Sequence, residues 1–202
     1  MFTGIIQAIG TVRRLEPRDE DLRLHIDTGA LDLGGARVGD SIAVNGACLT
    51  AVTLSDHGFA ADVSNETLAC TTLGDAREGD PVNLETSLTP STPLGGHLVS
   101  GHVDGIGTVE ERRADARSVR LGFLAPGELA RYIARKGSVC IDGVSLTVND
   151  VVGARFAVNV VPHTLRATTF DLFQPGRRVN LEVDLVARYL ERLLGERLVA
   201  HK

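Results

Sequence analysis

The chain has 202 residues, of which 43% are hydrophobic and 23% charged, as in an ordinary globular protein. Its 21 Lys and Arg stand against 26 Asp and Glu, so the formal net charge is −5, and aromatic residues make up only 4%. This composition, with no long basic run, argues against nucleic acid as a partner, and no apolar stretch approaches the ~18 residues that a membrane span needs.

Six short strands are predicted in the first half of the chain. Their segments are rich in Val, Ile, Leu and Thr, and turn signals such as Asn45-Gly46 and Asp56-His57-Gly58 separate them. Regular short strands of this kind indicate a small closed or partly closed antiparallel barrel, in which closure removes the exposed sheet edges. The predicted strands cover residues 5–12, 21–27, 41–44, 48–54, 59–64 and 82–86.

The same pattern returns 97 residues later with no net insertion. Residues 4–12 match 101–109, and residues 44–50 match 141–147. The chain is therefore one ancestral domain used twice, and two equivalent pockets are suited to hold two copies of one molecule. The predicted division is an N-terminal barrel, a C-terminal barrel and a terminal helix, at residues 1–97, 98–185 and 186–202.

Helices are predicted at three kinds of place. One covers residues 126–137, with Pro126 near its first position and Gly137 just past its end. Short helical turns follow Thr67 and Thr164, which could cap them. A linker over residues 87–94, which carries two prolines, joins the halves.

The last predicted element is an amphipathic helix over residues 184–199, with Asp184 as its cap. It lies outside the repeat, so its partner is no element of the duplicated plan. Its apolar side could pack on its own barrel or on the same helix of other subunits. This apolar stripe consists of Val186, Tyr189, Leu190, Leu193 and Leu194.

Three cysteines, Cys48, Cys70 and Cys140, are an odd number without C-x-x-C spacing. They are expected to be free thiols in a reducing compartment. The N-terminus has no basic segment ahead of an apolar one, as a signal peptide would have. We therefore expect a cytoplasmic protein.

Residues that could carry chemistry are found where the two copies differ, because a reaction between two identical molecules needs different groups on each side. Four of these residues also have a purely structural explanation. Cys48 could be a small buried hydrophobe, and Ser145 could bond a nearby backbone group. His102 could be a structural histidine in a strand, and Lys136 could interact with the carbonyls at the end of its helix. Singly, none identifies a site. The changes are Ile5 to His102, Gly39 to Lys136, Asn45 to Asp142, Cys48 to Ser145, and Glu66 to His163.

Nucleotide and metal signatures are not found. The glycines between Gly101 and Gly107 fall within a strand pattern, where a phosphate-binding loop is not expected. His97 and His102 are five residues apart, and neither a helix nor a strand would place two histidines at this spacing as metal ligands usually lie. No bound metal is expected.

Several longer motifs match one known family over nearly the whole chain. They are MFTGII at the start, NGACLT from Asn45, GGHLVSGHVDG from Gly95, KGSVCIDGVSLTV from Lys136, PHTL from Pro162 and VNLEVD from Val179. Together they resemble the riboflavin synthases that are built from a tandem lumazine-binding repeat.

The resemblance implies an all-β fold of two tandem six-stranded antiparallel Greek-key barrels with short helices, followed by a C-terminal α-helix. It implies a transferase that dismutates two molecules of 6,7-dimethyl-8-ribityllumazine to riboflavin and 5-amino-6-(D-ribitylamino)uracil, the last step of riboflavin biosynthesis. No cofactor is expected, because the lumazine is its own electron sink. The family is trimeric, with its C-terminal helices bundled and its active sites between the barrels of neighbouring subunits. An association with lumazine synthase is a further expectation.

The resemblance also implies catalytic roles. His102 is the leading candidate for proton transfer, since imidazole titrates near the working pH. Cys48 or Ser145 would add to ring position 7 of the donor, or orient a water that does so. Thr50, Thr147 and His97 would hydrogen-bond the ring or ribityl oxygens. Lys136 would favour developing anionic charge, and Asp184 would orient groups near the pocket.

The substrate contacts implied by the resemblance come from both halves of the chain. They are Gly4, Ile5, Ile6, Cys48, Leu49, Thr50, Asp62, Val63, Ser64, Asn65, Glu66, Thr67, Gly101, His102, Val103, Lys136, Ser145, Leu146, Thr147, Asn159, Val160, Val161, Pro162, His163 and Thr164.

Two other classes of protein are alternatives. A silent lumazine or flavin carrier needs one good pocket, so its second copy is free to decay. Here both copies keep the Leu-Thr motif at Thr50 and Thr147, and both keep Thr67 and Thr164, which favours the enzyme. A flavin-dependent reductase would need a nicotinamide domain, for which we expect no room in this chain.

Overall fold

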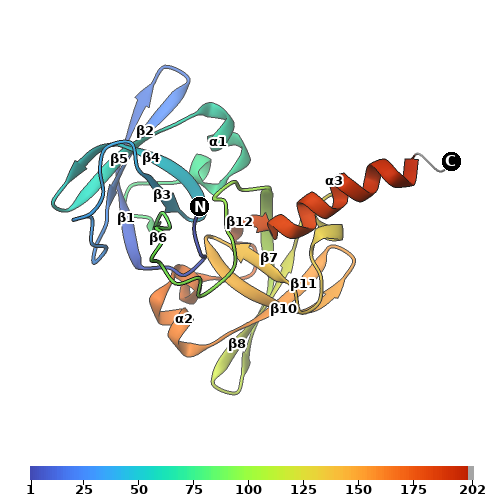
Figure 1. Ribbon diagram of the computed structural model, residues 1–202. Helices are drawn as coiled ribbons and strands as arrows, with labels where there is room; N and C mark the ends of the chain where they lie inside the picture. The colour runs from blue at the N-terminus through green and yellow to red at the C-terminus, as the bar shows by residue number, and fades with distance from the viewer. Residues whose placement is uncertain (200–202) are drawn as a thin grey trace.

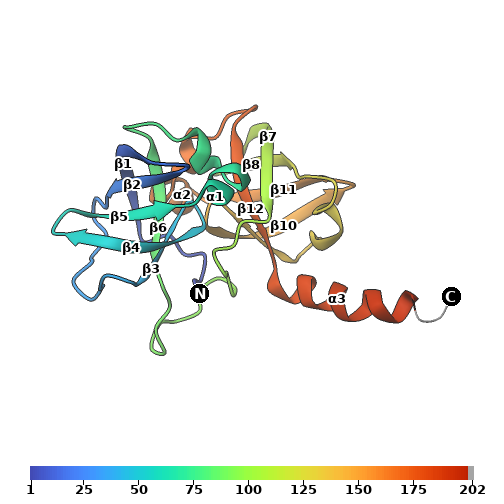
Figure 2. The ribbon, with the colours of Figure 1, turned by 90° about the horizontal axis from the view of Figure 1, so that it is seen from above.

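A computed structural model describes residues 1–199, with side chains described as far as residue 194. Two closed antiparallel barrels lie side by side, and one long helix projects from them (Figures 1 and 2). The first barrel has the strand order β1-β2-β5-β4-β3-β6. Its strands are β1 (Ala8–Arg18), β2 (Asp21–Asp27), β3 (Ser41–Val44), β4 (Ala47–Ser55), β5 (Gly58–Val63) and β6 (Pro81–Thr86).

The second barrel repeats the first, strand for strand. Every strand begins and ends 97 residues after its counterpart, which confirms the predicted duplication and the all-β fold. The strands are β7 (Gly105–Asp115), β8 (Ser118–Leu124), β9 (Ser138–Ile141), β10 (Val144–Val152), β11 (Arg155–Val160) and β12 (Arg178–Val183). Each barrel closes around its own apolar core. The division at residues 97 and 185 stays a prediction.

Short helices follow the fifth strand of each barrel, but their caps differ from those predicted. In α1 (Asn65–Cys70) the cap is Ser64, whose hydroxyl accepts from the backbone N–H of Thr67 at 3.2 Å. The other helix, α2 (Pro162–Ala167), begins with proline and has no side-chain cap. Thr67 and Thr164 therefore lie inside the helices, because the chain turns as soon as the preceding strand ends.

The helix predicted over residues 126–137 is wrong. Only a single 3-10 turn forms there, at Ala130–Tyr132. Ile133 is already extended and buried against the second core, and Lys136 has a φ of 68°. The backbone must turn here because the N–H of Lys136 bonds the carbonyl of Val148 in β10 at 2.8 Å.

Two buried asparagines lock the barrels together. The side-chain amide of Asn83 donates to the carbonyl of Asp142 and accepts from the N–H of Thr169, both at 2.8 Å. Asn180, its counterpart in β12, makes the equivalent pair of bonds back to the first barrel. Because both ends of each amide are satisfied by the opposite barrel, the two halves are held in one defined arrangement.

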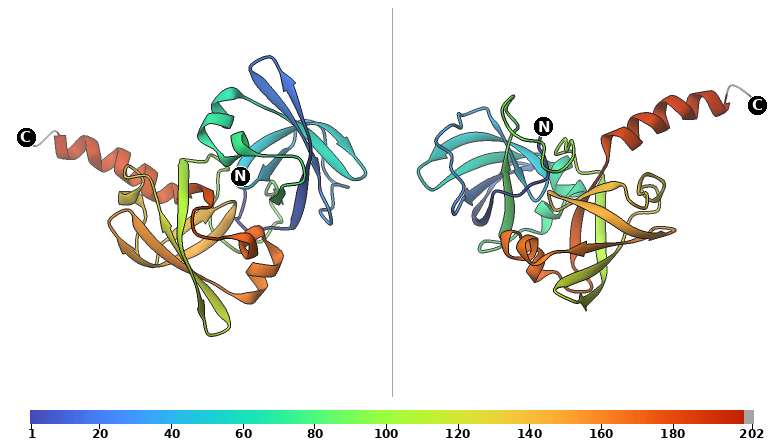
Figure 3. Two further views of the ribbon diagram at one scale, coloured as in Figure 1. Left: turned by 180° about the vertical axis from the view of Figure 1, so that it is seen from behind. Right: turned by 60° about the horizontal axis from the view of Figure 1, so that its bottom comes forward.

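The terminal helix α3 (Leu185–Val199) begins next to its predicted cap, with the N–H of Val186 bonding Asp184 at 2.9 Å. It docks through its polar side: Arg188 pairs with Asp104 at 2.8 Å, and Glu191 accepts from Tyr132. The apolar stripe faces outward instead, with exposed fractions of 51–66%. Packing of this stripe on its own barrel is therefore not observed, and Figure 3 shows the helix projecting away from the barrels toward the C-terminus. No described helix is long and apolar enough to span a membrane.

Candidate functional site

A short segment ahead of each barrel crosses to the opposite barrel. The two crossing segments are residues 4–6, ahead of the first barrel, and residues 101–103, ahead of the second. The carbonyl of Gly4 accepts from the N–H of Ser145 in β10 at 2.8 Å, and Ile6 packs on the second core. In the equivalent place, the carbonyl of Gly101 accepts from Cys48 in β4 at 2.8 Å, and Val103 packs on the first core. The predicted strand at residue 5 therefore starts only at Ala8, and His102 lies outside the strands.

Only glycine fits at the two crossing points. Gly4 has a φ of 74° and Gly101 a φ of 80°, in the left-handed region where a side chain is strained. A Cβ atom on Gly4 would lie 2.6 Å from Cβ of Ser145, and one on Gly101 would lie 2.6 Å from Cβ of Cys48. The crossing backbone thus lies directly against each of the two candidate nucleophiles.

The crossings bring the predicted contacts together as two clusters. Ala51 in β4 pairs with Ala61 in β5, and Val148 in β10 pairs with Val158 in β11. Because both pairs of strands are antiparallel, residues 48–50 lie beside the end of β5 and residues 145–147 lie beside the end of β11. The first cluster consists of residues 48–50, 62–67 and 101–103. The second consists of residues 145–147, 159–164 and 4–6. Each cluster combines one barrel with a segment from ahead of the other.

His97 joins the second cluster. Its Nδ1 lies 2.7 Å from Oγ of Ser145, and its Nε2 is buried without a partner among the described residues. Burial lowers the pKa of His97, and the Asp184 carboxylate acts in the opposite direction. A neutral imidazole beside the hydroxyl can take up its proton. From the sequence, His97 was predicted only to hydrogen-bond the ligand, and its contact with Ser145 was not predicted.

His102 is placed differently. Its backbone N–H bonds Oγ of Ser100 at 3.3 Å, and its side chain is exposed on the segment that covers Cys48. The half-buried Cys48 and the exposed imidazole therefore belong to the first cluster, whereas the Ser145 and His97 pair belongs to the second. The two clusters therefore differ in the hydroxyl or thiol that each contains and in the imidazole beside it.

The remaining copy differences contribute less. Lys136 is exposed in a left-handed turn where the first copy has Gly39, and no helix ends there. Glu66 on α1 and His163 on α2 are exposed at equivalent positions of the two clusters. Glu66 accepts from the thiol of Cys70 at 3.3 Å.

The change from Asn45 to Asp142 lies between the barrels and in neither cluster. Both residues are buried in left-handed turns, with φ of 46° and 44°. Each side chain accepts a backbone N–H of its own barrel, from Asn83 at 2.8 Å and from Asn180 at 2.7 Å. Burial raises the pKa of Asp142 to about 7. The structure therefore places Asp142 outside both clusters, where its side chain holds a turn between the barrels.

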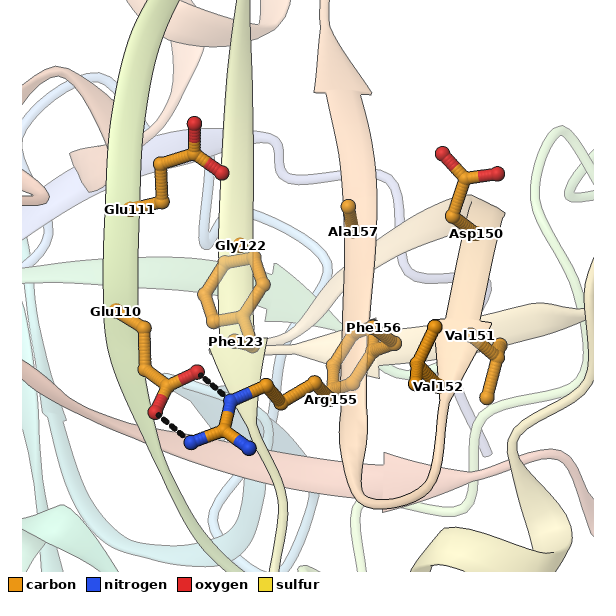
Figure 4. Close-up of a pocket in the computed structure, with 10 residues that line it drawn as sticks. All are labelled: Glu110, Glu111, Gly122, Phe123, Asp150, Val151, Val152, Arg155, Phe156 and Ala157. Carbon is orange, nitrogen blue, oxygen red and sulfur yellow. Dashed lines mark hydrogen bonds and ion pairs between the residues drawn. The ribbon is translucent and has the colours of Figure 1, made fainter.

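A hollow of about 220 Å³ opens on the second barrel between β7, β8, β10 and β11 (Figure 4). Apolar side chains and the carboxylates of Glu111 and Asp150 line it, and the ion pair of Glu110 with Arg155 stands at one side. None of its lining residues is a predicted contact. Within the described part of the chain, no group of three His, Cys, Asp or Glu could hold a metal. The described cysteines are free.

Comparison with known proteins agrees with the duplicated architecture. The family model of the lumazine binding domain matches twice, at residues 3–87 and 100–184. Riboflavin synthase of Photobacterium phosphoreum is 45% identical over 194 residues, which is 96% of this chain and 89% of that protein. Riboflavin synthase of Brucella abortus (strain 2308) is 44% identical over 198 residues, covering 96% and 98%.

A solved structure shows the same fold at lower identity. LumP complexed with riboflavin superposes with a TM-score of 0.84 at 24% identity, over 91% of this chain and 99% of LumP. The two matches of the domain model and the two relatives above 40% identity carry the assignment. The chain therefore belongs to the riboflavin synthase family and contains the lumazine binding domain twice.

Proposed function

We propose that the protein is a riboflavin synthase, a transferase that passes a four-carbon unit from one 6,7-dimethyl-8-ribityllumazine to a second. The products are riboflavin and 5-amino-6-(D-ribitylamino)uracil. The observation that carries the proposal is the pair of equivalent clusters, each completed by a segment from the other half, in a chain of this family. Riboflavin formed from the lumazine alone by the pure protein tests it.

In this proposal the enzyme chiefly positions two ligands. Each cluster holds one lumazine, and loss of a proton from the methyl group at ring position 7 gives a carbanion delocalised over the ring. Holding two reactants in the right geometry can supply on the order of 7–11 kcal/mol of the barrier. The lumazine ring accommodates the electrons, so we expect no cofactor.

The clusters divide the chemical work between them. His102 is proposed to move the proton at the first cluster. Ser145, whose hydroxyl proton can pass to His97 at 2.7 Å, is favoured over Cys48 for addition to ring position 7 of the donor. Thr50 and Thr147 would hydrogen-bond the ligands. Charge would be balanced by the ammonium of Lys136, and the Asp184 carboxylate would orient His97.

We further propose a homotrimer held by α3. The helix is fixed to its own subunit by Arg188 and Glu191, while its apolar stripe is exposed. An exposed stripe at helical spacing is the surface that another copy of the same helix would cover. A cytoplasmic location and an association with lumazine synthase stay predictions.

Two ligands are expected to bind per chain, because the contact pattern occurs in both halves. Calorimetric titration with a non-reacting lumazine analogue should saturate near two per chain. Saturation at one would instead favour a carrier with a single working pocket.

Ending the chain after Leu185 is expected to convert the trimer to monomers and to reduce activity, since the active site is proposed to be shared between subunits. A milder variant, Leu190→Glu with Leu193→Glu, should do the same because it places charge in the apolar stripe. Mass measured by light scattering reports the change. The matched control is Val152→Glu, a 77% exposed apolar position on the second barrel, which should keep the trimer. An unchanged mass for the truncated chain would refute the role of α3.

A further inference from the structure

Two buried carboxylates have no part in the proposed chemistry. Glu85 in β6 is 3% exposed and Glu182 in β12 is 2% exposed. They occupy the same position in the two copies of the repeat. Burying a carboxylate is costly unless several donors surround it, so each requires a structural or functional explanation.

Each glutamate clamps the backbone of one crossing segment. Oε1 of Glu85 accepts from the N–H of Thr3 at 2.7 Å and from its hydroxyl at 2.6 Å, while Oε2 accepts from the N–H of Gly4 at 3.0 Å. Glu182 repeats the arrangement on Ser100 and Gly101, at 2.6, 2.7 and 2.9 Å. Burial raises the pKa of both glutamates, and these hydrogen bonds oppose that rise.

The clamped backbone is also the part that reaches the opposite barrel. Gly4, held by Glu85, accepts from Ser145 of the second cluster. Gly101, held by Glu182, accepts from Cys48 of the first cluster. Each glutamate therefore sits in one barrel while the backbone that it fixes completes the cluster of the other.

We propose that Glu85 and Glu182 are positioning residues that act across the barrel boundary. Glu85 holds residues 4–6 against Ser145 in the second cluster, and Glu182 holds residues 101–103 against Cys48 in the first cluster. The inference rests on the proposed function only in treating these clusters as ligand sites. It adds to that function a reason why neither barrel forms a complete site from its own strands.

Substitution by glutamine separates this role from ordinary stabilisation of a barrel. The amide is isosteric with the carboxylate, but its NH₂ group faces an N–H donor and cannot accept from it. If the glutamates only stabilised their own barrels, Glu85→Gln would expose Cys48, which lies in the same barrel. Positioning across the boundary predicts the opposite pattern, in which Glu182→Gln exposes Cys48.

The test measures alkylation of a single thiol by iodoacetamide. The Cys70→Ser background removes the exposed thiol, and Cys140 is 1% exposed with a pKa that burial raises well above its usual value. Cys48 then reports on the first cluster. A second background, Cys48→Ser with Cys70→Ser and Ser145→Cys, places the reporter in the second cluster.

A crossed pattern is expected. Glu182→Gln should raise the alkylation rate at Cys48 by about tenfold or more, because the amide NH₂ cannot accept from the N–H that it faces, which leaves a buried donor of the segment unpaired. Glu85→Gln should change it by less than about threefold, through the bridge between Phe2 and Val99 that joins the segments. With the reporter at position 145 the order of the two variants should reverse.

Milder substitutions guard against loss of folding. Thr3→Val and Ser100→Ala remove one donor from each clamp and should show the same crossed order with smaller changes. Equal effects on both reporters, or a larger effect within each glutamate's own barrel, would overturn the inference. Because alkylation does not depend on turnover, failure here is distinguishable from failure of the proposed reaction.

Discussion

His102→Ile is expected to lower kcat by about 10²–10⁴-fold, the range that general acid–base catalysis contributes. The substitution imposes on the second copy the residue that the first copy carries at Ile5. Affinity should change much less, because the segment stays in place: its hydrogen bonds to Ser100 and Glu182 come from the backbone and not from the imidazole. Steady-state kinetics with the lumazine, beside calorimetric affinity for an inert analogue, separates the two effects.

The reciprocal change, Ile5→His, is the matched control. It adds an imidazole to the other crossing segment, and in the double variant with His102→Ile it should not restore turnover. The base would then face the wrong ligand. Near-normal turnover in His102→Ile would show that positioning alone carries the reaction, with proton transfer left to another group such as the His97 that bonds Ser145.

Asp142→Asn is expected to stabilise the protein above pH 7 by up to about 4 kcal/mol, the free energy that corresponds to the raised pKa of the aspartate. Burial raises this pKa from 3.8 to about 7, against the opposing effects of the Asn180 N–H and of Arg177. Between these two values the folded chain keeps a proton that the unfolded chain has lost. The free energy of unfolding therefore falls as pH rises through this window, and asparagine removes that loss.

The first copy shows that asparagine fits this turn, since Asn45 is buried there and accepts from Asn83 as Asp142 accepts from Asn180. Urea unfolding at pH 4 and pH 8, at one protein concentration, should show a small difference between the variant and the parent at pH 4 and a large one at pH 8. Asn45→Asp, the reciprocal control, should destabilise the protein in the same pH range. A difference that does not depend on pH would contradict the buried charge as its cause.

The strands were predictable because local signals agree with one another. Segments rich in Val, Ile, Leu and Thr, the Asn45-Gly46 and Asp142-Gly143 turns and a constant offset all indicate the same twelve strands. Local signals failed over residues 126–137, where Pro126 and Gly137 resemble helix ends. There the backbone bond from Lys136 to β10 decides the conformation, and a contact so distant in sequence leaves no trace in a local pattern.

The clusters were predictable only as a set of residues. Resemblance supplied their members, but the crossing of the segments and the pairing of His97 with Ser145 depend on tertiary contacts. The sequence itself contains one further signal. Glu85 and Glu182 stand within the same Val-Asn-Leu-Glu motif, and a charged residue repeated inside a buried strand indicates a fixed hydrogen-bonding role.

Conversion of 6,7-dimethyl-8-ribityllumazine by the purified protein, with no other organic compound present, tests the central claim most directly. Riboflavin is followed by its fluorescence, and loss of the lumazine is followed by its absorbance. One riboflavin should appear for every two lumazines consumed, at a rate proportional to protein concentration above that at which the trimer forms. Lumazine that binds and is recovered unchanged would contradict the account.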